Sequence, residues 1–123
     1  METTKKILVV DDDAGISEML KTLLEFSGYN VAVTQNAAVT QAEVESGSVD
    51  LVVLDMLISG IDGTQVCSDL RQNKKTTKVP ILMMSAHQEA GSKCLAAGAD
   101  DFIAKPFEME DFLMKVKRVM NGG

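Results

Sequence analysis

Short runs of uninterrupted apolar residues alternate along this chain with longer segments whose apolar residues recur every three or four positions. The runs at residues 7–10 and 51–54 contain only Ile, Leu and Val. A strand that is apolar at every position, rather than at every second one, is typical of a sheet buried on both faces. We therefore predict strands at residues 7–10, 29–33, 51–54, 79–83 and 101–104.

The segments between these runs have helical periodicity and suitable ends. A first helix is predicted between Asp13, which marks its entry, and Gly28, where a positive φ can end a helix. Asn36 and Asp62 can cap the next two helices. Gly91 weakens one further segment, because glycine costs about 1 kcal/mol against alanine in a helix. The remaining helices are predicted over residues 37–45, 63–72, 88–97 and 108–120.

Strand and helix alternate five times, which indicates an α/β fold with a parallel sheet. Right-handed crossovers put helices on both faces of such a sheet and make it doubly wound. The predicted fold class is therefore a five-stranded parallel sheet, (βα)5 and flavodoxin-like. The chain has 123 residues and no linker, low-complexity segment or repeat divides it, so we predict a single domain over residues 1–123.

Composition narrows the class of protein. The net charge of −6 argues against nucleic-acid binding, which needs clustered basic residues. Two cysteines, Cys67 and Cys94, lack metal-ligand spacing, and no signal peptide is present, so we predict reduced thiols that serve packing and a cytoplasmic location. The longest apolar runs are about five residues, too short to cross a bilayer, so no membrane partner is expected.

Polar residues follow four of the predicted strands directly. Parallel sheets bind ligands at the carboxyl ends of their strands, near the point where the strand order reverses. Three acids, one hydroxyl and one amine therefore converge at one edge of the sheet. They are Asp11 and Asp12 after the first strand, Asp55 after the third, Ser85 after the fourth and Lys105 after the fifth.

Carboxylates gathered at one edge repel one another. Two unit charges at 4 Å interact by about 4 kcal/mol at an effective dielectric near 20. Either one acid keeps a proton through a raised pKa, or a hard divalent cation neutralises the group. Asp11, Asp12 and Asp55 suit Mg²⁺, which prefers oxygen ligands and binds one or two carboxylates together with a phosphate. Such a site could hold a phosphoryl group, with Asp55 as the attacking carboxylate.

The ordered motifs resemble those of a known family. They are Val10-Asp11-Asp12, Asp55 followed by Asp62-Gly63, Ser85-Ala86, Gly98-Ala99-Asp100-Asp101-Phe102 and Lys105-Pro106-Phe107. Together they make the chain similar to a response regulator receiver domain of two-component signalling, with the chemotaxis-regulator-like fold. The resemblance covers roughly residues 5–121.

The resemblance implies a role for each site residue. Asp55 stands at the position of the phosphoacceptor. Asp11 and Asp12 match the pair that binds Mg²⁺, or Mn²⁺ in its place. Asp55 itself and the backbone carbonyl of Leu57 match the other protein ligands of that metal.

The same resemblance implies a conformational switch. Ser85 and Lys105 match the groups that bind the phosphoryl oxygens, and Phe102 matches an aromatic residue whose ring moves with the hydroxyl. The bond from Lys105 to Pro106 is expected to be cis. The surface over residues 88–97, 101–104 and 108–120 is then expected to change on phosphorylation. The domain is expected to be a signalling domain rather than an enzyme, although it assists its own phosphorylation and dephosphorylation.

The implied partners are a sensor histidine kinase or phosphotransfer protein upstream and an unidentified protein target or output domain downstream. The resemblance also leaves a weak homodimer as an alternative. The chain ends at Gly122-Gly123, shortly after the last predicted helix. This end is compatible with two alternatives, a stand-alone regulator and a receiver cut from a longer chain.

Two departures from the family pattern bear on the switch. Ser59 stands where the family most often has proline. The absence of proline is expected to loosen the loop that carries the Leu57 carbonyl. The segment between Ser85 and Gly98 is about two residues shorter than is common, so the helix there is expected to be short.

Three other functions use part of the same pattern. A phosphatase of the haloacid-dehalogenase type would use the Asp11 and Asp13 spacing, with Asp11 as its nucleophile. A flavin-binding electron carrier shares the fold, but three acids after the first strand would repel the flavin phosphate. A degenerate receiver would bind its partner without phosphorylation, although all the residues of the phosphoryl site are present. A nucleotide-triphosphate enzyme is not expected, because a glycine-rich lysine loop is missing.

Overall fold

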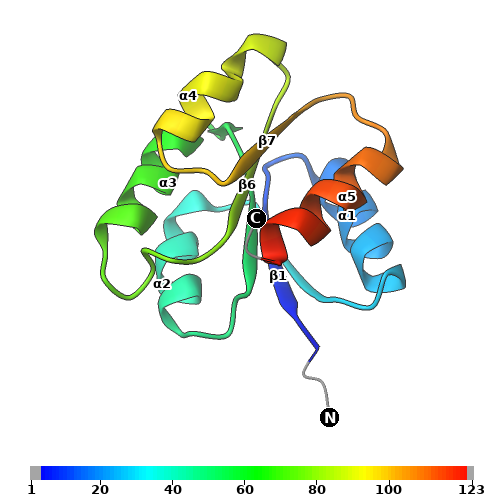
Figure 1. Cartoon of the computed structure of the whole chain (residues 1–123), viewed down its shortest axis with the longest axis horizontal. Coiled ribbons are helices and arrows are strands. Elements are labelled where there is room, and N and C mark those ends of the chain that lie inside the picture. Colours follow the sequence, from blue (N-terminus) through cyan, green and yellow to red (C-terminus); the bar gives the residue numbers. More distant parts are fainter. Residues whose placement is uncertain (1–3, 122–123) are drawn as a thin grey trace.

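Five parallel strands form one sheet in the computed structural model of this chain, which describes residues 4–121 (Figure 1). The strand order is β2-β1-β3-β6-β7, so the chain first builds the sheet to one side of β1 and then to the other. The order reverses between β1 and β3, and this confirms the predicted doubly wound fold. The strands are β1 (Lys6–Val10), β2 (Asn30–Thr34), β3 (Leu51–Asp55), β6 (Ile81–Ser85) and β7 (Asp101–Ala104).

Helices cover both faces of the sheet, as predicted (Figure 1). α1 (Ala14–Phe26) and α5 (Met109–Met120) lie on one face. α2 (Thr40–Glu45), α3 (Gly63–Gln72) and α4 (Gly91–Ala96) lie on the other. Short 3₁₀ turns lead into α2 and α4, as η1 (Ala37–Val39) and η2 (Gln88–Ala90).

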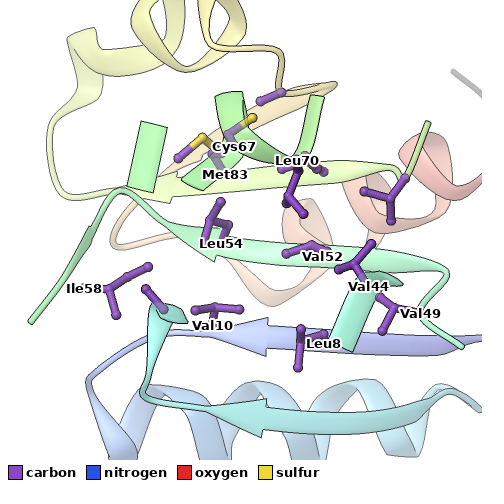
Figure 2. Close-up of a cluster of buried hydrophobic side chains, with 14 of the residues drawn as sticks. Leu8, Val10, Val44, Val49, Val52, Leu54, Ile58, Cys67, Leu70 and Met83 are labelled. Atoms are coloured by element: carbon purple, nitrogen blue, oxygen red, sulfur yellow. The ribbon is translucent and has the colours of Figure 1, made fainter. Parts of the chain in front are cut away.

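Alternate residues of each central strand enter two separate cores. Leu8, Val52 and Leu54 pack under α2, α3 and α4, in the cluster that Figure 2 shows. Ile7 and Val53 point to the opposite face and pack against α1 and α5. Because neighbouring strand residues face opposite sides of a sheet, continuous apolar strands supply both layers at once. Cys67 and Cys94 are free and fully buried in the first core, which supports their predicted packing role.

Most predicted boundaries agree with the structure to within two residues. α3 and β7 have the predicted ends, and Asp13, Asn36 and Asp62 cap their helices through side-chain oxygens. β6 starts at Ile81 rather than residue 79, because Pro80 has no N–H to donate to a ladder. The predicted helix over residues 37–45 is divided between η1 and α2, and the one over residues 88–97 between η2 and a six-residue α4.

A small antiparallel hairpin, absent from our predictions, follows the end of β3. β4 (Leu57–Ile58) pairs with β5 (Ile61–Asp62) across a two-residue turn at Ser59 and Gly60. Both turn residues have positive φ, 49° and 82°, which matches the twist of hairpin strands. The short pairing has only two residues a side, too few for a hydrophobic pattern to reveal.

Within residues 4–121, every helix is too short or too polar to span a membrane. Residues 1–3 and 122–123, which the single-domain prediction includes, lie outside the described range.

Burial differs sharply between Phe112 and Phe26, so their replacement should affect the stability of the fold differently. Phe112 is fully buried, whereas 91% of Phe26 is exposed. Phe112→Ala should lower the free energy of unfolding by about 3–5 kcal/mol, because it leaves a cavity between α5 and the sheet. Phe26→Ala should change it by less than about 0.5 kcal/mol. Urea unfolding followed by circular dichroism measures both, and equal losses would contradict the burial described here.

Candidate functional site

One cavity opens at the carboxyl ends of β1, β3 and β6 and has a volume of about 570 Å³. All five residues predicted from the strand ends line it, and Leu57 lines it as well. Strand register explains why they meet: Val10 pairs with Leu54, and Ser85 pairs with Ala104. Ser85 itself and the residues that follow these pairs therefore emerge at the same edge of the sheet. The five are Asp11, Asp12, Asp55, Ser85 and Lys105.

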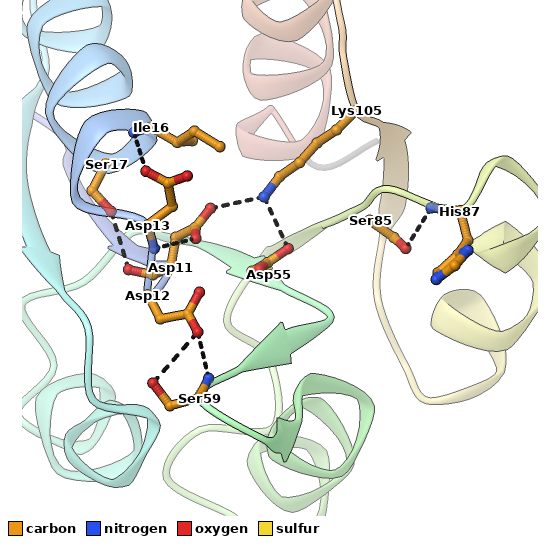
Figure 3. Close-up of polar contacts among 10 residues, drawn as sticks. All are labelled: Asp11, Asp12, Asp13, Ile16, Ser17, Asp55, Ser59, Ser85, His87 and Lys105. Carbon is orange, nitrogen blue, oxygen red and sulfur yellow. Dashed lines mark hydrogen bonds and ion pairs between the residues drawn. The ribbon is translucent and has the colours of Figure 1, made fainter.

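Lys105 lies between two of the acids (Figure 3). Its Nζ is 3.0 Å from Oδ2 of Asp11 and 3.2 Å from Oδ1 of Asp55. Burial alone would lower the pKa of Lys105, but the hydrogen bond to Asp11 and the charges of Asp55 and Asp11 outweigh burial and raise it. The lysine is therefore charged at neutral pH. It partly neutralises the two acids that it pairs with.

Asp55 is the last residue of β3, and only 8% of it is exposed. Burial raises the pKa of its carboxyl above the usual value of 3.8, and the nearby charge of Asp11 raises it further. The charge of Lys105 and its hydrogen bond oppose this shift without cancelling it. The ionised form of Asp55 is therefore destabilised by burial and by the charge of Asp11, and another cation nearby would stabilise it.

Asp11 is fully buried, and both its carboxylate oxygens have partners. Oδ1 accepts the N–H of Asp13 at 2.9 Å, and Oδ2 accepts from Lys105. The Ser17 hydroxyl donates to the backbone oxygen of Asp11 at 3.1 Å. The side chain of Asp13 caps α1 by accepting the N–H of Ile16, which confirms it as helix entry.

Asp12 is exposed and is held from the hairpin turn. Its Oδ2 accepts the backbone N–H of Ser59 at 2.6 Å, and the Ser59 hydroxyl lies 3.4 Å from the same atom. Sequence reasoning singled out Ser59 only as a missing proline. Its contact with Asp12 depends on the hairpin, which no local pattern signalled.

The three carboxylates fit a divalent cation. Asp11, Asp12 and Asp55 each offer an oxygen, and these atoms all lie within 4.8 Å of one another. Hard oxygen donors in such a group suit Mg²⁺ or Mn²⁺. Leu57 lines the cavity and is 63% exposed, and the role of its carbonyl as a ligand stays a prediction.

Ser85 faces away from Asp55 (Figure 3). Its Oγ accepts the backbone N–H of His87 at 3.0 Å, and the residue is buried. Phe102 does not line the cavity; its half-buried ring packs against the first core and closely over Gly91, where a Cβ would lie 3.2 Å from the ring. The peptide bond from Lys105 to Pro106 is cis, as predicted.

Glycine at position 63 lets α3 begin directly against the end of β3. A Cβ there would collide with the backbone oxygen of Asp55 and lie 2.9 Å from the Cα of Met56. The Gly63 N–H instead donates to the Met56 carbonyl at 2.7 Å. Lys93 from α4 also lines the cavity, and its distance along the chain hid it from sequence reasoning.

Comparison with known proteins agrees with this geometry. Residues 7–117 match the model of the family described as the response regulator receiver domain. The alkaline phosphatase synthesis transcriptional regulatory protein PhoP of Bacillus subtilis is 40% identical over 118 residues. That match covers 94% of this chain and 48% of PhoP, so the chain spans about half the length of this relative.

Solved structures share the fold. A protein described as a response regulator from Chloroflexus aurantiacus superposes with a TM-score of 0.91 at 32% identity, covering 97% of this chain and 99% of its own. The receiver domain of a sensor histidine kinase from Pseudomonas aeruginosa PAO1 gives a TM-score of 0.86 at 24% identity, covering 98% of this chain and all of its own. That domain holds a magnesium ion in its active-site cleft, and at this identity the likeness speaks for the fold alone.

The raised pKa of Asp55 predicts a pH-dependent gain in stability for Asp55→Asn. A carboxyl whose pKa is higher in the folded state stabilises the fold below its unfolded pKa and loses that effect as pH rises through the folded pKa. In chelator at pH 7, Asp55→Asn should therefore melt a few degrees higher than the parent chain. The gain should vanish in acid below the ordinary carboxyl pKa.

Thermal unfolding followed by circular dichroism measures this effect. Asp69→Asn removes an exposed acid outside the cavity and serves as the matched control, with no expected change. A lower melting temperature for Asp55→Asn at pH 7 would show that the pairing with Lys105 outweighs burial.

Proposed function

Because this chain belongs to the family of response regulator receiver domains of two-component systems, we propose that Asp55 is its phosphoacceptor. The proposed donor is the phosphohistidine of a sensor histidine kinase or of a phosphotransfer protein. The observation that carries this assignment is the cavity in which Asp11, Asp12, Asp55 and Lys105 converge. We propose that residues 1–123 act as one receiver domain.

Asp55 supplies the nucleophile. A carboxylate oxygen of Asp55 attacks the phosphorus and forms an acyl phosphate, while the bond from phosphorus to the donor imidazole breaks and the imidazole leaves with the bonding electrons. Lys105, already within 3.2 Å of Asp55, keeps its proton and holds a positive charge beside the phosphoryl oxygens. Such a fixed charge stabilises the negative charge of the transferring group.

Asp11, Asp12, Asp55 and the carbonyl of Leu57 are the proposed ligands of Mg²⁺ or Mn²⁺. When bound, such an ion neutralises the carboxylates and the phosphoryl oxygens. The three carboxylates supply oxygen atoms within 4.8 Å of one another, which supports this assignment. Lys105 alone does not fully neutralise these acids. The pKa of Asp55 stays raised by burial and by the charge of Asp11 in spite of its pairing with Lys105.

Ser85 and Phe102 are the proposed switch. Phosphorylation places new acceptor oxygens on Asp55. Ser85, whose Oγ lies on the side of His87, turns toward them in this proposal and gives up the His87 N–H. Each hydrogen bond to a charged group contributes about 1.5–3 kcal/mol, and about 1.4 kcal/mol shifts an equilibrium tenfold. Movement of Ser85 gives the Phe102 ring space to turn, which changes the surface of α4, β7 and α5.

The geometry disfavours the phosphatase alternative. A phosphatase of the Asp11-x-Asp13 type needs Asp11 free to attack, but Asp11 is fully buried with both oxygens hydrogen-bonded. Asp13 directs its carboxylate to the N–H of Ile16 at the start of α1. Asp55 has the more accessible carboxylate of the two buried acids, with 11% of its side chain exposed against 1% for Asp11.

The downstream partner is proposed to be a protein or an output domain that reads α4, β7 and α5. Exposed Leu95 on α4 and Met114 on α5 give that surface apolar contact area. A weak homodimer through the same surface is a second proposal. The free thiols of Cys67 and Cys94 suit the reducing cytoplasm, which is the location that we propose.

Phosphorylation by a small phosphodonor tests Asp55 directly. Incubation with Mg²⁺ and acetyl phosphate should raise the mass by one phosphoryl group, and chelator should prevent the gain. Asp55→Asn should show no gain, whereas the surface control Asp69→Asn should be labelled like the parent chain. A normally labelled Asp55→Asn, or label mapped to Asp11, would refute the assignment of the phosphoacceptor.

The amide proton of His87 reports on the switch. Beryllofluoride mimics a phosphoryl group on a carboxylate, and its binding should draw the Ser85 hydroxyl away from the His87 N–H. The ¹H,¹⁵N resonance of His87 should then move upfield as its hydrogen bond is lost. In Ser85→Ala the same resonance should already lie upfield and should move much less. An unmoved His87 resonance in the fully bound parent chain would contradict the proposed movement of Ser85.

A further inference from the structure

The three proposed metal ligands differ in how their carboxylates are held. Asp11 is fully buried and bonded to two donors, and Asp55 is paired with Lys105. Asp12 is exposed, and its side chain accepts hydrogen bonds only from Ser59 within residues 4–121. Without Ser59, the Asp12 side chain would be free to rotate about two bonds. The orientation of this ligand therefore depends on a residue 47 positions away in the sequence.

We propose that Ser59, through its backbone N–H, is a positioning residue that holds Asp12 in the orientation needed for the divalent cation. This inference rests on the metal site of the proposed function. The bond from the Ser59 nitrogen to Oδ2 of Asp12 is 2.6 Å long and involves a charged acceptor, so it is strong and directional. In Figure 3 the second oxygen of Asp12 points toward the side of the site where Asp11 and Asp55 lie. One oxygen is thus held by the turn while the other faces the metal position.

The hairpin turn aims this N–H. Ser59 has φ 49° and Gly60 has φ 82°, so the chain reverses within two residues between β4 and β5. Proline could not replace Ser59 in this role, because proline has no N–H and fixes φ near −65°. The serine that departs from the usual family pattern therefore does more than loosen the loop. It adds a hydrogen bond between the loop and a metal ligand that a proline cannot make.

The same turn couples two of the proposed ligands. Leu57, whose carbonyl is a proposed ligand, lies in β4 and pairs with Asp62 of β5. Asp12 is bonded to the turn that joins these two strands. Partners that orient a ligand in this way typically change metal affinity by 10- to 100-fold when they are lost. The hairpin is therefore expected to set the affinity of the site for the metal.

The sharpest test removes the N–H and keeps every side chain. A semisynthetic chain with an ester in place of the amide between Ile58 and Ser59 replaces this donor by an oxygen atom and weakens the Ile58 carbonyl as an acceptor. Titration with Mn²⁺, followed by electron paramagnetic resonance without any phosphodonor, should show an affinity at least about tenfold weaker than that of the parent chain. Unchanged affinity in the ester chain would overturn the proposal.

Ser59→Ala is the matched control, because it keeps the N–H and removes only the hydroxyl, which is 3.4 Å from Asp12. Its Mn²⁺ affinity should stay within about threefold of the parent value. A loss as large as that of the ester chain would assign the effect to the hydroxyl and overturn the role of the backbone. Asp69→Asn controls for the removal of an acid outside the cavity and should bind Mn²⁺ normally.

The amide resonance of Ser59 provides a second readout. Its short bond to a carboxylate should place the proton strongly downfield in the metal-free chain and keep it there at saturating Mg²⁺. An upfield move on binding would mean that the metal displaces Ser59, so that Ser59 competes with the ion, and this result would also overturn the proposal. These titrations contain no phosphodonor, so they can succeed or fail independently of the labelling of Asp55.

Discussion

The repulsion among Asp11, Asp12 and Asp55 is the constraint on which the rest of the site depends. Their oxygens lie within 4.8 Å of one another, and two of the three side chains are buried. Lys105 offsets part of this repulsion by pairing with two of them, and it raises its own pKa by doing so. The remaining unfavourable charge makes the site receptive to a cation.

The fold makes this concentration of charge tolerable. Each central strand sends alternate residues into two apolar cores, so polar groups are excluded from the strand interiors and gather at their ends. The two cores are closed by helices on opposite faces (Figure 1). Burial of the apolar side chains in these cores stabilises the fold and offsets the cost of placing the charge of Asp55 in a buried position. A site at the edge of such a sheet can keep a charge that Lys105 compensates only in part while the fold stays intact.

The site also joins residues that differ in burial. Asp55 and Ser85 are the last residues of buried strands, whereas Asp12 is exposed and bonded to the β4–β5 turn. Ser85 Oγ accepts the backbone N–H of His87, and the proposed switch exchanges this hydrogen bond for one to a phosphoryl group on Asp55.

The sequence by itself determined the alternation of elements, the helix caps and the five strand-end residues of the site. These features depend on local chemistry: apolar runs, capping side chains at Asp13 and Asp62, and motifs directly after strands. The tertiary structure decided the rest. The position of Lys105 between Asp11 and Asp55 and the hydrogen bond from Ser59 to Asp12 both depend on distances across the fold. Residues 47 or 94 positions apart form hydrogen bonds only when parallel strands and a hairpin bring them together. No local pattern encodes such a distance, because it is set by the packing of the whole sheet.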